Sequence, residues 1–407
     1  MNGRRPRIGL FGILGAGNIG NDASVEAIMR YLRAEYPDAT IDAMCKGWER
    51  MRDRYGIAAT PLQWQQDHVR PGRTGKALAA LGKLIDGFRT AAWVRGHDVV
   101  IIPGMGILDP TLPLSPWSTP YAVYLLAAWG RVFGAKVALV AVGADKASAR
   151  TTQSLYSRTA RLAAYVSFRD QGSRETLERE GVDVSAFSVH PDLVWTIPAT
   201  REQPEDPKLV AVGVMAYYGG QADRARAAEV FASYTESVAE FTGWLLDTGH
   251  DVRLFYGDEA DQAALEKILA DVRSVRPGLA PGRLTPYYPA THEDVTDLLG
   301  PVAAVVATRL HSLMFALKLG KPTIALSYAR KIDAMMADLG LGEYCLPAGS
   351  VDVEALQALF TDVELRQHEI SREVWKRAAE CSLAARAQLT ELSDVLFSGH
   401  GLPTTAR

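Results

Sequence analysis

Arg309 and His311 are the two residues of this sequence best placed to do chemistry. They follow a continuous apolar run, Val302–Ala307, and open a stretch that favours a helix, with Ser312 beside them. The start of a helix after a buried strand offers N–H groups and the positive end of the helix dipole to an anion. Arg309 adds a fork of donors for a carboxylate or phosphate, and His311 can transfer a proton near neutral pH. Alternatively, both residues are structural, with Arg309 paired to a surface acid and His311 hydrogen-bonded in the core. Their position between a strand and a helix favours the functional interpretation.

A second group of basic residues follows the next predicted strand, residues 323–326. If the two strands are neighbours, their ends bring several cations to one edge of a sheet, as a multiply charged anion requires. A solvated basic turn is the simpler alternative. The residues of this group are Tyr328, Arg330 and Lys331.

Three glycines, Gly15, Gly17 and Gly20, follow the first predicted strand, residues 7–11, and lead into a helix. Glycines there let the backbone approach an anion at the helix start. Their G-x-G-x-x-G spacing matches the dinucleotide fingerprint only in part, because no acid ends a second strand and Asp42 falls within that strand region. A tight turn that packs helix on strand explains the same spacing.

Polar residues beside these glycines and at two later strand ends could line the same site. Asn18 and Asp22 could bind a ligand or merely cap the helix. Gly104 and Gly106 follow a predicted strand at residues 98–102. Arg169 follows the predicted strand Tyr165–Phe168 and would supply another anion contact, unless it pairs with a neighbouring acid.

Composition excludes several classes of protein. The 407 residues include 44 Lys plus Arg and 47 Asp plus Glu, so the formal charge of −3 does not suit a general nucleic-acid binder. The sequence contains no run of 18 apolar residues, so it predicts no membrane-spanning helix. The three cysteines are far apart, and no His/Cys cluster has metal-ligand spacing, so we expect neither disulfides nor a bound metal. P-loop, zincin and α/β-hydrolase motifs do not occur. We expect a cytoplasmic, enzyme-sized protein.

Apolar runs bounded by glycines alternate with longer amphipathic stretches, which indicates a parallel α/β architecture. Further strands are predicted at residues 137–142, 209–214 and 252–256. Helices are predicted at about residues 22–35, 173–180, 225–247, 311–319 and 353–397. In the third of these helices, apolar residues recur every three or four positions, at Val230, Tyr234, Val238, Phe241 and Leu245.

Residues 197–208 hold three prolines and five charges without periodicity and are predicted to link two domains. The pattern restarts after them, so we expect two Rossmann-like domains facing a cleft, as in GT-B proteins, followed by C-terminal helices. The predicted boundaries are 1–200 for an acceptor-side domain, 205–352 for a donor-side domain, and 353–407 for helices that pack back on both. Ligands would bind at the carboxyl ends of the strands.

Four ordered blocks within residues 7–342 resemble the polysaccharide pyruvyl transferase family. The most specific block begins Arg309-Leu-His311, continues through Gly320-Lys-Pro322 and Ser327-Tyr328-x-x-Lys331, and ends at Leu339-Gly340-Leu341. The other blocks are residues 18–23, Phe168-Arg169-Asp170 and Pro191-Asp192. Asn21 stands where the family usually has Asp, which removes a carboxylate from that position, and Gly104-Met-Gly106 replaces a fuller glycine run.

The resemblance implies transfer of pyruvate from phosphoenolpyruvate to two hydroxyls of a sugar, with no other cofactor. On this basis we expect anion contacts from Arg309 and Lys331, an acid–base role for His311, help with phosphate from Arg169, and orientation or deprotonation of a sugar hydroxyl by Asp22. The partner would be a sugar, a glycan or a lipid-linked sugar. A homo-oligomer and contact with the inner face of a membrane stay open. The full set of predicted binding residues is Gly17, Asn18, Gly20, Gly104, Gly106, Arg169, Arg309, Ser312, Tyr328, Arg330 and Lys331.

Two other functions fit the same residues. The architecture and the basic cluster also suit a glycosyltransferase with a nucleotide-sugar donor. In that case Asp258 and Glu259, which follow strand 252–256, would bind the ribose. A sugar- or lipid-carrier-binding protein with a degenerate site is the third, which the intact Arg309, His311 and Lys331 disfavour.

The aromatic stretch 113–129 could line a sugar-binding mouth or touch a lipid-linked acceptor at a membrane surface. Tyr121, Leu125 and Trp129 are spaced four residues apart, so we expect them to form the buried face of a helix beneath a loop.

Overall fold

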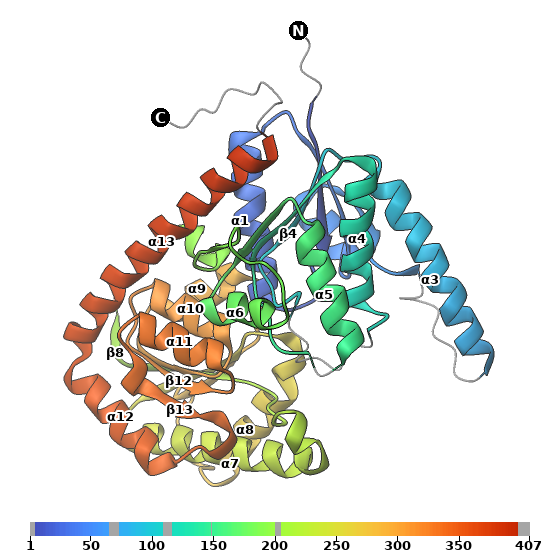
Figure 1. The fold of residues 1–407 in the computed structure, drawn as a ribbon. Coiled ribbons are helices and arrows are strands. Elements are labelled where there is room, and N and C mark those ends of the chain that lie inside the picture. The colour runs from blue at the N-terminus through green and yellow to red at the C-terminus, as the bar shows by residue number, and fades with distance from the viewer. Residues whose placement is uncertain (1–4, 65–72, 109–115, 148, 200–204, 398–407) are drawn as a thin grey trace. The chain divides into compact units, whose positions relative to one another are not determined.

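The computed structural model describes residues 5–64, 73–108, 116–147, 149–199 and 205–397 (Figure 1). Backbone contacts divide the chain into two compact units. Unit 1 contains Met1–Ala16, Asn21–Ile197 and Leu383–Arg407. Unit 2 contains Gly17–Gly20 and Pro198–Ser382. The short glycine segment Gly17–Gly20, which leads into the first helix, therefore groups with the second half of the sequence.

Among the described residues, unit 1 holds one sheet of seven parallel strands. The strands are β1 (Arg7–Gly12), β2 (Thr40–Cys45), β3 (Ala58–Pro61), β4 (Val99–Pro103), β5 (Lys136–Val142), β6 (Tyr165–Phe168) and β7 (Ser188–Val189). Their order is β3-β2-β1-β4-β5-β6-β7. Every residue of β4 is buried, as expected for a Val/Ile strand with helices on both faces of its sheet.

Helices connect the strands of unit 1. They are α1 (Ile19–Glu35), α2 (Trp48–Tyr55), α3 (Arg73–Val94), α4 (Thr119–Phe133), α5 (Arg150–Leu162) and α6 (Gln171–Arg179). Figure 1 shows α3, α4 and α5 side by side.

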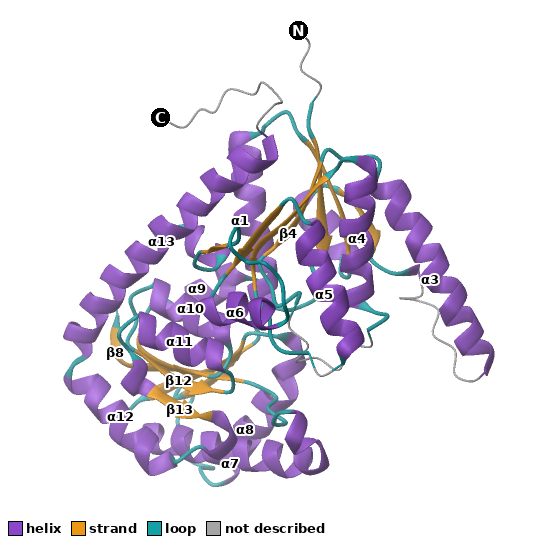
Figure 2. Ribbon diagram, in the orientation of Figure 1, coloured by secondary structure: helices purple, strands orange, loops and turns teal. Residues whose placement is uncertain are grey.

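Unit 2 repeats this layer architecture with a six-stranded parallel sheet in its described part. Its strands are β8 (Asp206–Val214), β9 (Asp251–Tyr256), β10 (Leu284–Tyr287), β11 (Val302–Ala307), β12 (Thr323–Ser327) and β13 (Cys345–Pro347), and their order is β10-β9-β8-β11-β12-β13. Its helices are α7 (Ala227–Asp247), α8 (Gln262–Ser274), α9 (His292–Leu299), α10 (Leu310–Lys318), α11 (Arg330–Asp338) and α12 (Val353–Leu365). Figure 2 shows the sheet between α7 and α8 on one side and α9, α10 and α11 on the other.

Both sheets have the strand order of a Rossmann fold, in which the chain runs to one edge and then returns to build the other. The order reverses between β1 and β4 in unit 1 and between β8 and β11 in unit 2. Ligands of such sheets bind beyond the carboxyl ends of the strands at this reversal. The residues that follow β8, β9 and β11 are therefore the first to inspect in unit 2.

The structure confirms the α/β class with two Rossmann-like sheets, and the predicted strands and helices occur within a few residues of their expected bounds. The strands that the sequence missed, β3, β7, β10 and β13, are too short to show a hydrophobic period. The predicted C-terminal boundary of the linker 197–208 is wrong. β8 already begins at Asp206, whose N–H donates to Pro301 O at 2.8 Å, although the first residues of this strand are polar and exposed.

The expected buried face of α4 is also wrong. Tyr121, Leu125 and Trp129 are only half-buried, and smaller residues on another face of the helix, Ala122, Val123, Leu126, Ala127 and Gly130, form the core contact. A β-carbon on Gly130 would lie 2.5 Å from Val137 Cγ2, so α4 approaches β5 too closely for aromatic side chains to fit between them. Residues 113–115 of the aromatic stretch lie outside the described residues.

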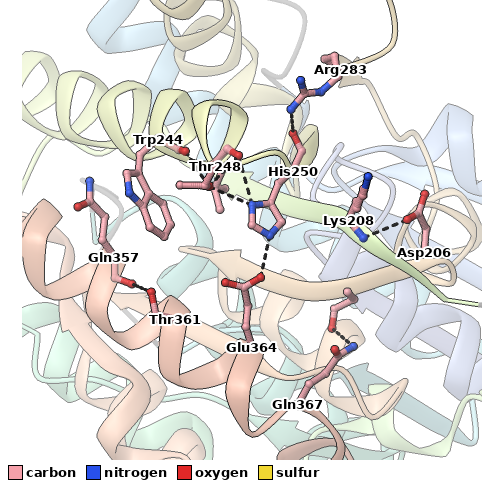
Figure 3. A network of polar contacts seen from close by, with 12 residues as sticks. Asp206, Lys208, Trp244, Thr248, His250, Arg283, Gln357, Thr361, Glu364 and Gln367 are labelled. Carbon is pink, nitrogen blue, oxygen red and sulfur yellow. Dashed lines mark hydrogen bonds and ion pairs between the residues drawn. The ribbon is translucent and has the colours of Figure 1, made fainter.

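C-terminal helices pack against each unit. In unit 2, His250 Nε2 lies 2.8 Å from Glu364 Oε1 of α12, and Thr248 Oγ1 lies 3.1 Å from His250 Nδ1 (Figure 3). Arg283 donates to the carbonyl of His250 at 2.6 Å. The long helix α13 (Gln367–Phe397) ends in unit 1, where Lys136 Nζ donates to two carbonyls of its last residues at 2.8 and 2.9 Å.

Candidate functional site

An ion pair joins the ends of two strands at the reversal point of unit 2. Arg309 follows β11, and its Nε and Nη2 donate to Asp261 Oδ2 and Oδ1, each at 2.7 Å. Asp261 follows β9 and its side chain is fully buried, whereas 23% of the Arg309 side chain is exposed. The Nε–Nη2 edge of the guanidinium is therefore engaged inside the protein. Asp261 thus occupies a pair of donors of the kind that the sequence suggested for a bound carboxylate or phosphate.

The third strand of this corner, β8, holds the ion pair in place. The N–H of Ala216, two residues after β8, donates to Asp261 Oδ1 at 2.8 Å. The hydroxyl of Tyr234 on α7 accepts from Met215 N at 3.2 Å and shares a hydrogen bond of 2.6 Å with Thr308 Oγ1. Thr308 directly precedes Arg309, so its hydrogen bond to Tyr234 fixes the backbone next to Arg309, while Asp261 fixes the guanidinium.

This environment keeps Arg309 charged. Burial disfavours the guanidinium, but the hydrogen bonds and the charge of Asp261, with smaller contributions from Tyr328 and Asp258, hold the pKa of Arg309 above its ordinary value. Burial, with a smaller contribution from the charge of Asp258, raises the pKa of the Asp261 carboxyl, and the hydrogen bonds and charge of Arg309 oppose that shift. Arg309 thus stays protonated at the start of α10, with its charge paired to Asp261.

His311 is the second residue of α10 and lies against the glycine segment of unit 2. A β-carbon on Gly20 would overlap the Cγ and Nδ1 atoms of the His311 ring, so only glycine fits there. Ser312 is buried, and a β-carbon on Gly257 would come within 2.6 Å of its hydroxyl oxygen. The predicted residues Gly20, His311 and Ser312 are therefore neighbours in one tightly packed corner.

Three hydrogen bonds tie the same glycine segment to the residues after β9. Asn18 Nδ2 donates to Asp258 Oδ2 at 2.7 Å, the N–H of Ile19 donates to Gly257 O at 3.2 Å, and Glu259 N–H donates to the carbonyl of Gly17 at 3.2 Å. Asp258 Oδ1 also accepts from the N–H of Ala260 at 3.1 Å. Both oxygens of this acid, which a ribose would require in a glycosyltransferase, therefore already accept hydrogen bonds within unit 2.

The second basic group lies after β12, which is hydrogen-bonded to β11. Tyr328 contributes to the raised pKa of Arg309 and so lies near it, and Lys331 Nζ sits 5.8 Å from the centre of the Tyr328 ring. Arg330, the first residue of α11, is exposed. Neither Arg309 nor Ala329, the N-cap residues of α10 and α11, carries a side-chain acceptor for the first-turn N–H groups. Two helix starts and their cations thus follow neighbouring strands.

Unit 1 contains a separate buried polar cluster. Arg169 Nη1 donates to Asp192 Oδ2 at 3.3 Å, and both side chains are almost completely buried. Ser24 Oγ donates to Asp192 Oδ1 at 3.4 Å. Gly104 has a positive φ of 52°, and a β-carbon on it would overlap the Ser24 hydroxyl. Gly106 follows with half-buried backbone. This cluster lies at the reversal point of the first sheet.

Asp22 has a structural partner in unit 1. Its Oδ1 accepts from the N–H of Gly15 at 2.7 Å, which closes the turn between β1 and α1. Asp42, the other acid considered near these glycines, accepts from Trp93 Nε1 at 2.8 Å and lies 3.0 Å from His97 Nε2. These contacts account for both carboxylates as parts of the fold, and the catalytic role of Asp22 stays a prediction.

The structure sorts the predicted site residues into two groups. Gly17, Asn18, Gly20, Arg309, His311, Ser312, Tyr328, Arg330 and Lys331 belong to unit 2, and Asp22, Gly104, Gly106 and Arg169 belong to unit 1. Sequence reasoning missed Asp261 and Tyr234 as parts of the site. Asp261 lies three residues after the noted acid Asp258, and Tyr234 was recognised only as a core residue. Asp192 entered only through the family resemblance.

Solved structures with the same fold support this arrangement of strands. The chain is similar to a UDP-GlcNAc 2-epimerase from Neisseria meningitidis, with 11% identity, 97% of this chain and 100% of that chain covered, and a TM-score of 0.60. It is similar to HepE of Anabaena, with 12% identity, coverage of 96% and 99%, and a TM-score of 0.61. It is also similar to MurG of Acinetobacter baumannii, with 13% identity, 96% of this chain and 99% of that chain covered, and a TM-score of 0.57. At such low identity these likenesses show the fold, which is GT-B.

No curated protein sequence matches the chain. A family model described as polysaccharide pyruvyl transferase matches residues 18–330. The match runs from Asn18 in the glycine segment, through Arg169 and Asp192, to Arg309, His311 and the start of α11. It thus covers most of the chain and both polar groups described above apart from Gly17 and Lys331, which lie just outside it. The chain belongs to the polysaccharide pyruvyl transferase family.

Proposed function

We propose that this protein transfers the pyruvyl group of phosphoenolpyruvate to two hydroxyls of a sugar, in the synthesis of a cell-surface polysaccharide or glycoconjugate. The family supports pyruvyl transfer. The observation that carries the choice of donor is the charged Arg309 at the start of α10, two residues from His311 and near Tyr328 and Lys331. Phosphoenolpyruvate carries a carboxylate and a phosphate on one three-carbon frame, so its site needs several cations and helix N–H groups close together.

The proposed reaction balances without an oxidant or a second cofactor. A proton adds to the methylene carbon of phosphoenolpyruvate, which makes the neighbouring carbon electrophilic. A sugar hydroxyl oxygen bonds to that carbon, and the bond to the phosphate oxygen breaks with its electron pair leaving on phosphate. The second hydroxyl oxygen then closes the ketal ring. Of the two hydroxyl protons, one replaces the proton given to the methylene carbon and the other leaves with phosphate.

The predicted site residues would divide these tasks. His311 would give the proton to the methylene carbon, since imidazole exchanges protons near neutral pH. The Nη1 side of Arg309 and the ammonium of Lys331 would bind the carboxylate and phosphate. Arg169 would assist with phosphate, and Asp22 would orient or deprotonate a sugar hydroxyl. No cofactor beyond phosphoenolpyruvate itself is part of this proposal.

Glycosyl transfer from a nucleotide-sugar is the competing proposal. It has support because two of the similar solved structures were determined with UDP-GlcNAc or with UDP and glucose. The engaged carboxylate of Asp258 speaks against it, since a ribose would have to compete with Asn18 and Ala260 for that acid.

The test gives the full chain either phosphoenolpyruvate or a UDP-sugar, together with a panel of glycosides that have free neighbouring hydroxyls. Phosphate release and the mass of each glycoside are followed. We expect phosphate from phosphoenolpyruvate and a glycoside heavier by one pyruvyl ketal. The variant His311→Asn should lose about 10²–10⁴-fold of this rate, and His368→Asn, an exposed histidine on α13, should lose none. A glycoside that gains a hexose from the UDP-sugar instead would replace the proposal with glycosyl transfer.

A further inference from the structure

The helix α3 has its apolar face on the outside. Leu81, Leu84 and Phe88 are spaced three and four residues apart and so share one face of the helix. Their exposed fractions are 50%, 64% and 77%. The polar residues Asp86 and Thr90 are buried on the inner side. A helix on the surface of a globular protein normally shows the opposite arrangement, so this outer face needs a partner.

The inner side of α3 is fixed by specific contacts, which rules out a helix that has merely turned over. Asp86 Oδ1 accepts from the N–H of Trp64 at 2.7 Å, and Arg89 Nη2 donates to the carbonyl of Pro61 at 2.8 Å. Lys83 Nζ lies 3.7 Å from Asp86 Oδ2. Rotating the helix to bury its apolar face would break all of these contacts.

An aromatic pair adds to the apolar surface beside α3. The rings of Trp117 and Tyr121 meet edge to face at 5.6 Å, and 58% of Trp117 is exposed. Burial and the nearby charge of Asp86 raise the pKa of Tyr121, so this pair adjoins the middle of α3. Figure 1 shows α3 and α4 next to each other. Tryptophan is enriched where proteins meet the interface of a bilayer.

Charge identifies the partner. The chain as a whole has a formal charge of −3, but residues 73–95 contain five basic residues and one acid, Asp86. The basic residues are Arg73, Lys76, Lys83, Arg89 and Arg95, of which Lys83 and Arg89 also make the inner contacts described above. A basic helix with an exposed apolar face suits the surface of an anionic bilayer. A two-fold contact with a second copy would instead place the same basic segment against itself.

We propose that the outer face of α3, defined by Leu81, Leu84 and Phe88, binds the surface of a membrane that contains anionic lipids. No helix in the described ranges is both long and apolar enough to cross a bilayer, so the contact would lie in the plane of the headgroups. The inference does not depend on which donor the enzyme uses.

Flotation of the full chain with vesicles tests the proposal. One set of vesicles is phosphatidylcholine alone, and the other contains one-third phosphatidylglycerol. We expect the chain to float with the anionic vesicles, and less so at high salt, which screens the basic residues. The double variant Leu84→Ser/Phe88→Ser should bind at least about tenfold more weakly, because it removes both exposed anchors. The matched control Leu365→Ser/Leu383→Ser changes residues that are 82% and 70% exposed elsewhere and should bind like wild type.

Three results of the flotation assay would overturn the proposal. The first is that the wild-type chain floats with neither set of vesicles, and the second is that the Leu84/Phe88 variant floats as well as wild type. The third is that the control loses as much binding as the Leu84/Phe88 variant. Light scattering without vesicles adds a fourth, since a dimer that becomes a monomer only in the Leu84/Phe88 variant would assign this face to a second copy. Circular dichroism of each variant confirms that it is folded.

Discussion

The α-carbon of Gly20 lies so close to the imidazole of His311 that a β-carbon on Gly20 would overlap the ring atoms Cγ and Nδ1. Both residues belong to unit 2, although they are 291 positions apart in the chain. The glycine therefore sets the position of the histidine that we propose as the proton donor. Its φ is not in the left-handed region, so the absence of a side chain, and not backbone freedom, is what this position requires.

Gly20→Ala should displace the His311 ring and lower pyruvyl transfer by about 10²-fold, the lower part of the range for a general acid. Overpacking of this kind should also destabilise the fold by about 1–3 kcal/mol. The matched control is Gly278→Ala, where a β-carbon meets nothing within 4 Å. Rates of phosphate release and urea unfolding of both variants check this. Equal behaviour of the two variants would show that His311 does not depend on Gly20.

Asp261→Asn should weaken the fold by about 3 kcal/mol, because it leaves the buried side of Arg309 without its counter-charge. The carboxylate holds the guanidinium through two hydrogen bonds of 2.7 Å, and an amide can accept only one of them. The control is Asp271→Asn, which changes an acid paired with Lys267 in a more exposed position on α8 and should cost less than about 1 kcal/mol. Urea unfolding measures both. A cost for Asp261→Asn as small as that of the control would mean that the pair contributes little.

Tyr234 should make stability depend on alkaline pH. Burial raises the pKa of its hydroxyl from 10.0 to about 12. The folded protein thus holds this proton more tightly than the unfolded chain, and the resulting stability is complete below pH 10 and is lost as the pH rises through about 12. At neutral pH, Tyr234→Phe should cost about 1–3 kcal/mol, since Met215 N–H and Thr308 lose a partner.

The difference in unfolding free energy between wild type and Tyr234→Phe should therefore shrink by about 2 kcal/mol between pH 10 and 12. Denaturant unfolding of both proteins across this range provides the measurement, and subtracting the two curves removes the other alkaline groups. A difference that stays constant with pH would show that the Tyr234 hydroxyl titrates normally.

Gly104→Ala should be more costly than an ordinary glycine substitution in the same unit. The left-handed backbone at Gly104 costs about 1–2 kcal/mol with any side chain, and the β-carbon would also overlap the Ser24 hydroxyl beside Asp192. Gly134→Ala isolates the backbone cost, because Gly134 has a φ of 78° and nothing within 4 Å of a β-carbon. Thermal unfolding should give Gly104→Ala a lower Tm than Gly134→Ala. The reverse order would contradict the close packing of this cluster.

The fold could be predicted from the sequence where burial leaves a simple pattern. Val302–Ala307 is apolar throughout because helices cover both faces of its sheet, and the structure finds every residue of it buried. The pattern failed on α4, where small residues face the sheet and the larger, regularly spaced aromatics lie on the flanks. Hydrophobic spacing alone does not show how closely a helix approaches its sheet.

The site was predicted only in part, for a related reason. Arg309 and His311 were recognisable because they follow a strand directly, whereas the partner of Arg309 depends on strand order. Asp261 reaches Arg309 because β9 and β11 both flank β8, a relationship that no local pattern encodes. The same holds for Tyr234, whose ring fits a core stripe while its hydroxyl serves the backbone before Arg309.

The central claim is that Arg309 binds phosphoenolpyruvate, and thermal unfolding with ligands tests it most directly. The panel contains phosphoenolpyruvate, UDP-GlcNAc and UDP-glucose, with wild type, Arg309→Gln and Lys331→Met, and with Arg179→Gln as a control for the loss of an exposed charge. At about 100 times its Kd a ligand stabilises the fold by roughly 2.7 kcal/mol, which gives a measurable shift. We predict a shift with phosphoenolpyruvate in wild type and in Arg179→Gln that is lost in the other two variants. A shift with a UDP-sugar alone, or one with phosphoenolpyruvate that survives in Arg309→Gln, would contradict the claim.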